Sequence, residues 1–82
     1  MDPRQIIRIA ALEEEYHFDH PHALMEADIH SITTNDIEEV MIRGTINQKK
    51  TKNKRYRLRY RDIQIVVEIA FYQVTIITVM RE

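Results

Sequence analysis

The chain has 82 residues, with 12 Lys and Arg against 13 Asp and Glu, four His and no Cys. This length predicts a single domain with a small core, and the lack of cysteine excludes disulfides and thiolate-based metal sites or nucleophiles. No apolar run approaches the roughly 20 residues of a membrane span, and no basic-then-apolar leader opens the chain, so we expect a cytoplasmic domain that makes no use of a membrane.

Charge is distributed unevenly along the chain. Residues 1–48 carry three basic and ten acidic side chains, whereas residues 49–82 carry nine basic and three acidic ones. Most of the cations fall in one stretch without an intervening acid: Lys49, Lys50, Lys52, Lys54, Arg55, Arg57, Arg59 and Arg61. Such an end of the molecule can meet RNA or an acidic protein partner. Equally, the charges can be solvated and protect the edge of a sheet.

Residues 1–44 have the pattern of helices. Asp2 caps a first helix that begins at Pro3 and ends near Glu14. A short extended link at 16–19 follows, and Pro21 then opens a second helix. The spacing from Thr33 to Asp36 caps a third helix. Gly44 follows its last residue, where a left-handed conformation is usual.

From residue 45 the period changes to alternation. Residues 55–61 place four arginines on one face and Tyr or Leu on the other. Residues 63–70 predict a central strand, 71–73 a turn and 74–80 another strand, and residues 45–50 are expected to form an edge strand. We therefore predict one α+β domain in which two to three helices (1–44) pack on one face of a three- to four-stranded antiparallel sheet (45–82).

Apolar periodicity gives a predicted core. The residues expected to be mostly buried are Ile6, Ile9, Leu24, Ile37, Val40, Leu58, Val66 and Ile76.

Two kinds of chemistry are compatible with the histidines. His17, His20, His22 and His30, with Asp19, could hold zinc, copper or nickel, but Pro21 opposes their convergence and surface positions are the commoner reading. Alternatively, one histidine can serve as the acid or base in RNA cleavage by the 2′-hydroxyl, with arginines on the phosphorane. Aromatic residues are available to stack on bases or to pack in the core: Tyr16, Tyr56, Tyr60 and Phe71.

The stretches from His22 to Ala27 and from Ile32 to Gly44 resemble a family of small prokaryotic toxin-like proteins, the domain-of-unknown-function family numbered four-two-five-eight. Its pattern is a His-Ala start, a helix, an Ile, a second capped helix with Asp-hydrophobic-Glu-Glu, and a glycine. Residues 74–79 look like its closing strand, and the resemblance covers residues 5–80. It implies a fold like those of RelE and the barnase–EndoU–colicin ribonucleases. It also implies the toxin component of a type II toxin–antitoxin pair, an endoribonuclease neutralised by a protein such as a YgiT-type zinc-finger antitoxin.

On this hypothesis His22 acts as acid or base, Arg57 and Arg59 hold phosphate, and Thr78 orients a group nearby. The remaining RNA contacts are expected from Lys49, Lys50, Lys52, Lys54, Arg55 and Arg61. The chemistry requires no metal or other cofactor.

Four positions depart from the family pattern. Glu26 and His30 stand where many members have arginine, Gln64 where a histidine is common, and Met80 where a closing tyrosine is usual. These departures favour an alternative, a non-catalytic module that binds RNA or an acidic protein partner. A third hypothesis is a homo-oligomer whose strand edges pair between copies. The position of His22 relative to the arginine face distinguishes the first two.

Overall fold

The computed structural model describes residues 2–19, 21–47 and 54–82. The described residues form an α+β domain, which confirms the predicted class. Its helices are α1 (Pro3–Leu12), α2 (His22–Ile29) and α3 (Thr34–Arg43). Its strands are β1 (His17–Phe18), β2 (Thr45–Ile46), β3 (Arg55–Tyr60), β4 (Ile63–Ala70) and β5 (Gln73–Arg81).

The strands form one mixed sheet in the order β1-β5-β4-β3-β2. Strands β2 to β5 pair antiparallel, whereas β1 pairs parallel to β5. The prediction of an antiparallel sheet with three to four strands is therefore wrong at this edge. The expected link at 16–19 adds to the sheet because the backbone N–H of Asp19 donates to the carbonyl of Ile76 at 2.8 Å and Phe18 packs against the core.

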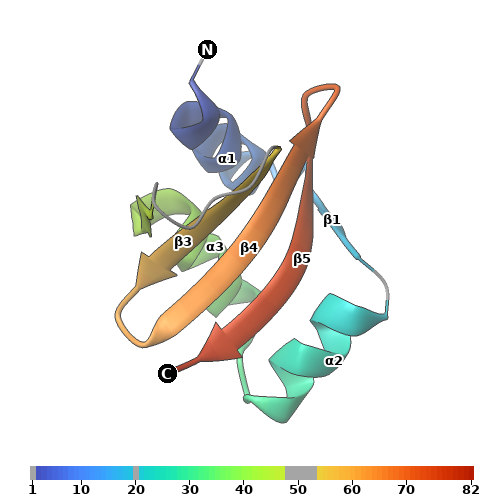
Figure 1. Cartoon of the computed structure of the whole chain (residues 1–82), viewed down its shortest axis with the longest axis vertical. Helices are drawn as coiled ribbons and strands as arrows, with labels where there is room; N and C mark the ends of the chain where they lie inside the picture. The colour runs from blue at the N-terminus through green and yellow to red at the C-terminus, as the bar shows by residue number, and fades with distance from the viewer. Residues whose placement is uncertain (1, 20, 48–53) are drawn as a thin grey trace.

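The described helices all lie on one face of the sheet or beside its β5 edge (Figure 1). Figure 1 shows α1 and α3 behind β3 and β4, while α2 lies beside the β5 edge. Between the layers lies a core of fully buried side chains that includes Ile7, Met41, Ile65 and Val79. None of the described helices is long and apolar enough to cross a membrane.

The core prediction is correct for the third helix and for two of the three strand residues, but Val66 and the residues of the first two helices are less buried than predicted. Ile37, Val40, Leu58 and Ile76 are at most 1% exposed. Ile6 is half-buried and packs against the core, and Val66 is half-buried on the uncovered face of the sheet.

Ile9 is 38% exposed because α1 turns Ile7, Ala10 and Ala11 to the core instead. Leu24 is 43% exposed because α2 contacts the sheet through the small side chains of Ala23 and Ala27, one helical turn apart.

The helix ends follow local chemistry. The Asp2 side chain accepts the backbone N–H of Gln5 at 3.0 Å, and Thr33 and Asp36 form a reciprocal capping box at the start of α3. The prediction of a left-handed Gly44 is wrong, because its φ and ψ are −70° and 161°. Glycine is required there for another reason: a Cβ would lie 2.4 Å from the carbonyl oxygen of Val40 and 3.1 Å from that of Arg59.

Candidate nucleic-acid interface

The uncovered side of the sheet carries three rows of side chains across β3, β4 and β5. Residues that pair across neighbouring strands point to the same face of the sheet. Along each strand, the residues on this uncovered side alternate with residues that point into the core. The rows are Arg55–Glu68–Thr75, Arg57–Val66–Thr78 and Arg59–Gln64–Met80. We call this surface the open face. Three of the four strand arginines share it, as the alternation predicts, while Arg61 belongs to the turn that follows β3.

A β-bulge brings Thr78 onto the open face. Val66 pairs with Thr78 but Val67 pairs with Ile76, so Ile77 is an extra residue in β5. In a regular strand that buries Ile76, Thr78 would point to the core and Val79 to solvent. The bulge reverses both, so Val79 is buried and the Thr78 hydroxyl lies in the same row as Arg57.

Carboxylates neutralise two of the three arginines on the open face. Arg55 Nε lies 3.1 Å from Glu68 Oε2, and Arg59 Nη2 lies 2.6 Å from Glu82 Oε2. Arg59 also donates to the carbonyl of Arg61 at 3.3 Å, and Gln64 donates to Glu82. Both guanidinium groups therefore have partners within the protein. One of them belongs to Arg59, which was predicted to hold phosphate.

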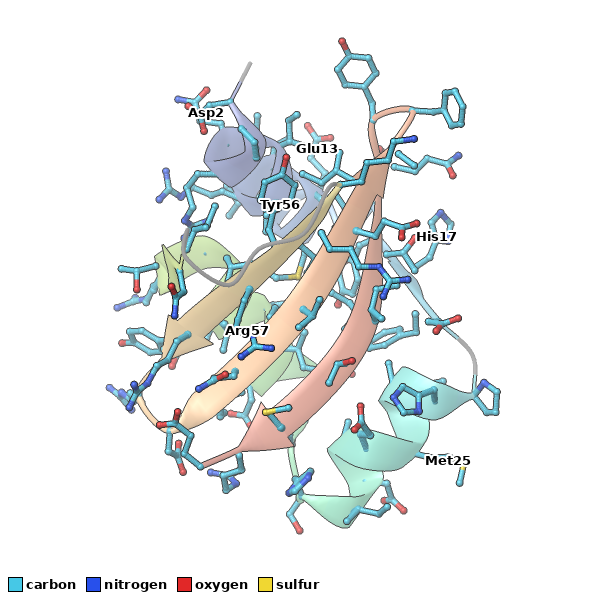
Figure 2. The ribbon with its side chains drawn as sticks, in the orientation of Figure 1. Asp2, Glu13, His17, Met25, Tyr56 and Arg57 are labelled. Atoms are coloured by element: carbon cyan, nitrogen blue, oxygen red, sulfur yellow. The ribbon has the colours of Figure 1, made fainter. Side chains whose placement is uncertain are left out.

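Arg57 differs from its neighbours on the strand. Its guanidinium makes no hydrogen bond or ion pair with any described residue, and it lies opposite Val66, between the cations at positions 55 and 59. Figure 2 shows Arg57 over the middle of the sheet, on the face that points away from the helices. A half-buried cation without a counter-charge, flanked by two other cations, favours an external anion.

The remaining residues predicted to contact RNA lie before or after β3 in the sequence. Lys54 precedes β3 and is exposed, and the Arg61 guanidinium lies 5.2 Å from the centroid of the Tyr60 ring. Lys49, Lys50 and Lys52 lie outside the described residues. The described cations thus border the open face along β3.

His22 begins α2 at the opposite edge of the sheet. Its Nε2 lies 3.2 Å from Glu26 Oε1, and the same carboxylate oxygen accepts the backbone N–H of Val79 at 3.2 Å. Beyond Ile76, β1 no longer pairs with β5, so Glu26 satisfies a donor at a strand edge that has no strand partner. In the sequence, Glu26 stands out only as a departure from the family pattern. The bond of Glu26 to Val79 depends on β1 pairing with β5 no further than Ile76.

His22 and the arginines do not form one compact pocket. Strand β3 lies two strands, or roughly 10 Å, from β5. Three surface hollows lined by described residues lie elsewhere, two beside Tyr72 and one beside Arg4, and none of these three joins His22 to Arg57. A concave pocket shared by His22 and the arginines, the arrangement expected of a catalytic site, is therefore not among these three hollows.

The aromatic residues mostly serve the fold. Tyr16, Tyr56 and Tyr60 pack against the core. The Tyr16 hydroxyl donates to Glu38 Oε2 at 2.5 Å, and burial, followed by this bond to Glu38, raises the pKa of Tyr16. Phe71, the fourth aromatic residue predicted to stack on bases or pack in the core, is instead 93% exposed at the tip of the β4–β5 hairpin.

The histidines are dispersed over the described structure. His17 pairs with Thr75 at the β1 edge (Figure 2), whereas His22 and His30 lie at the two ends of α2. His20 lies outside the described residues. Within the part of the chain that the structure describes, no group of three or more His, Asp or Glu side chains could hold a metal ion.

No protein-family model, curated protein or solved structure matches the chain. What the domain does has to be inferred from these side chains and their placement.

Proposed function

We propose that the open face binds the backbone of single-stranded RNA, with Arg57 as its central phosphate contact. The observation that carries this proposal is the pairing pattern on β3. Arg55 and Arg59 have carboxylate partners, while Arg57 between them has none among the described residues. A planar guanidinium suits a phosphate, which it can contact through two parallel hydrogen bonds.

Other features of the open face fit an extended strand. The surface is a broad sheet face rather than a pocket, and the Thr78 hydroxyl lies in the Arg57 row. The half-buried apolar side chains of Val66 and Met80 offer contact area to sugars and bases. The basic stretch at 49–61 adjoins the same strand in the sequence and adds a favourable field for a polyanion.

The test compares two substitutions that remove the same charge from the same strand and face. Arg57→Gln should weaken binding of a fluorescent oligouridylate by at least about tenfold, since a hydrogen bond to a charged group is worth roughly 1.5–3 kcal/mol. It should also reduce the slope of log affinity against log salt by about 0.7, the value for one phosphate on a single strand. Arg55→Gln should weaken binding much less, because Glu68 already occupies Arg55.

Equal losses in the two variants would show that only net charge matters and would contradict a specific contact at Arg57. Binding of an acidic peptide as tight as that of RNA would instead assign the surface to a protein partner. Each variant should melt cooperatively near the parent.

A second candidate function is metal-independent RNA cleavage, and the His22–Glu26 contact favours it. A carboxylate fixed by a backbone N–H can hold an imidazole in one orientation, as acid–base catalysis requires. On this proposal the chain is the toxin of a toxin–antitoxin pair and has an antitoxin partner, as the sequence resemblance implies. A relationship to the RelE and barnase folds belongs to the same proposal.

Cleavage predicts a specific effect at His22. His22→Ala should lower the rate on a mixed RNA substrate by about 10²–10⁴, with RNA affinity retained. His17→Ala is the matched control, because His17 is also exposed and lies on β1 rather than beside Glu26. The assay contains a chelator. No cleavage by the parent would leave RNA binding as the function, whereas full cleavage by His22→Ala would mean that the histidine is structural.

A further inference from the structure

The acidic half of the chain has three cations, and the fold brings them together. Arg4, Arg8 and Arg43 are the basic residues among positions 1–48. All three line one surface hollow of about 440 Å³, with Gly44, Thr45 and Ile46 completing its wall. We call this the arginine hollow. None of the described residues that line it is acidic.

Two of the arginines are held by the last turn of α3. Arg4 and Arg8 are four residues apart, so they share a face of α1. Arg4 donates through Nη1 to the carbonyl of Met41 at 2.5 Å and through Nη2 to that of Ile42 at 2.7 Å. Arg8 donates through Nε to the carbonyl of Ile42 at 3.1 Å. These bonds satisfy carbonyls that a helix end leaves unpaired.

Capping α3 does not explain the whole cluster. It uses both terminal nitrogens of Arg4 but only Nε of Arg8. The two Nη groups of Arg8 and the guanidinium of Arg43 make no bond with any described residue. Burial, and then repulsion from Arg8, lower the pKa of Arg4, as expected where cations crowd together. An anion in the hollow would relieve this repulsion.

The arginine hollow borders the open face. Thr45 lines the hollow and pairs with Arg59 on β3. Two residues along that strand is Arg57, so the backbones at positions 45 and 57 are separated by roughly 8 Å, from a strand spacing of about 4.8 Å and a rise of about 3.3 Å per residue. A strand of nucleic acid that crosses the open face can therefore reach the hollow over the β2 edge.

We propose that the arginine hollow holds a second phosphate of the RNA strand bound on the open face, through Arg8 and Arg43. This inference rests on the proposed function. It predicts that binding depends on length, because a dinucleotide has a single internal phosphate and cannot occupy Arg57 and the hollow at the same time.

The experiment measures fluorescence anisotropy with 2′-O-methyl oligouridylates, which a 2′-hydroxyl mechanism cannot cleave. A dinucleotide, which has one internal phosphate, and a dodecanucleotide are titrated at several salt concentrations against the parent, Arg43→Gln and Arg57→Gln. Arg43 is chosen because it bonds no described residue, so its substitution should leave the melting temperature near that of the parent. Arg4→Gln is not used, because Arg4 caps α3.

The proposal expects Arg43→Gln to weaken the dodecanucleotide by at least about tenfold, to lower its salt slope by about 0.7 and to leave the dinucleotide unchanged. Arg57→Gln should weaken both lengths. If Arg43→Gln leaves both lengths unchanged, or weakens both equally, the second phosphate site is overturned while the Arg57 contact stands. If Arg57→Gln also has no effect, the proposed function fails with it.

Discussion

Two exposed aromatic residues stand in a backbone conformation that non-glycine residues rarely adopt. Phe71 and Tyr72 have φ of 53° and 62° and are 93% and 85% exposed. They form a two-residue turn, since Ala70 pairs with Gln73. Such turns favour Asn-Gly, because asparagine and glycine tolerate positive φ at lower cost.

The double variant Phe71→Asn/Tyr72→Gly should therefore raise the free energy of unfolding by about 1–2 kcal/mol. Urea denaturation followed by circular dichroism measures this change. A decrease would mean that Tyr72, which lines two hollows beside α1, contributes packing that outweighs the strain.

Gly44 illustrates a different constraint on a single residue. A Cβ at this position would meet two backbone carbonyl groups, one on α3 and one on β3. Neither carbonyl group can move away unless its helix or strand shifts as well. Gly44→Ala should lower the free energy of unfolding by about 1–3 kcal/mol. Thr45→Ala, at the next and exposed position, should change it by less than about 0.5 kcal/mol. Equal stabilities for the two variants would show that α3 and β3 separate easily.

At the scale of elements, the capping box makes the start of α3 sensitive to acid. Thr33 donates its backbone N–H to Asp36 Oδ2 at 3.0 Å, and Asp36 donates its own to Thr33 Oγ1 at 3.1 Å. The bonds from Thr33 lower the pKa of Asp36. The ionised carboxylate therefore stabilises the folded state fully above the unfolded pKa of about 3.9, and this stabilisation is lost as pH falls through the lower folded pKa.

Asp36→Asn should accordingly lower the melting temperature at neutral pH, and its difference from the parent should shrink below about pH 4. Thermal melts between pH 2.5 and 7 provide the measurement. A difference that stays constant across that range would mean that the charge of Asp36 makes no contribution.

Helix starts could be predicted because their signals are local. Asp2, Pro3, Thr33 and Asp36 act on backbone groups within one turn, so the sequence alone places both caps. The burial stripe of α1 could not be fixed in the same way. The face of α1 that points inward depends on how the helix packs against α3. Apolar periodicity predicts Ile9 in the core, whereas Ala10 and Ala11 are the buried residues.

The sequence predicts the extended backbone at 16–19 but not its place in the sheet, because β1 has two residues and its pairing to β5 is parallel and distant in sequence. The bulge in β5, by contrast, corresponds to a pattern of apolar residues. Val74, Ile76 and Val79 are buried with spacings of two and then three, and an extra residue is the simplest way to keep all three inside.

The ion pairs of the open face were hidden for a related reason. Arg55 meets Glu68 only in the register that a two-residue turn at Arg61 and Asp62 imposes. A two-residue turn at these positions places Arg55 opposite Glu68 and Arg57 opposite Val66, so the register distinguishes the paired arginine from Arg57. The position of His22 at the β5 edge depends on where α2 docks, which no local pattern specifies.

At the scale of the whole molecule, the two halves of the chain stabilise each other. Strand β1 and helix α2 come from the first half and pack on β5, the last strand. Arg81, near the end of β5, donates to the carbonyl of His30 at 3.2 Å and lies 2.7 Å from Asp62. The helical layer and the sheet therefore share one core and should unfold together.

Ile76 tests this coupling because it is fully buried at the point where β1, β4 and β5 meet. Ile76→Ala should lower the free energy of unfolding by about 2–5 kcal/mol, a large share of the roughly 4–12 kcal/mol expected for a domain of this length. Far-ultraviolet circular dichroism reports chiefly the helices. In a Tyr16→Phe/Tyr72→Phe background, which removes the other two tyrosines, tyrosine fluorescence reports Tyr56 and Tyr60 on β3. Both signals should shift to lower urea concentration by the same amount, since the variant weakens a core that both layers share. If the tyrosine signal shifts while the helical signal keeps its midpoint, the layers unfold independently, and the parallel pairing of β1 with β5 does not couple them.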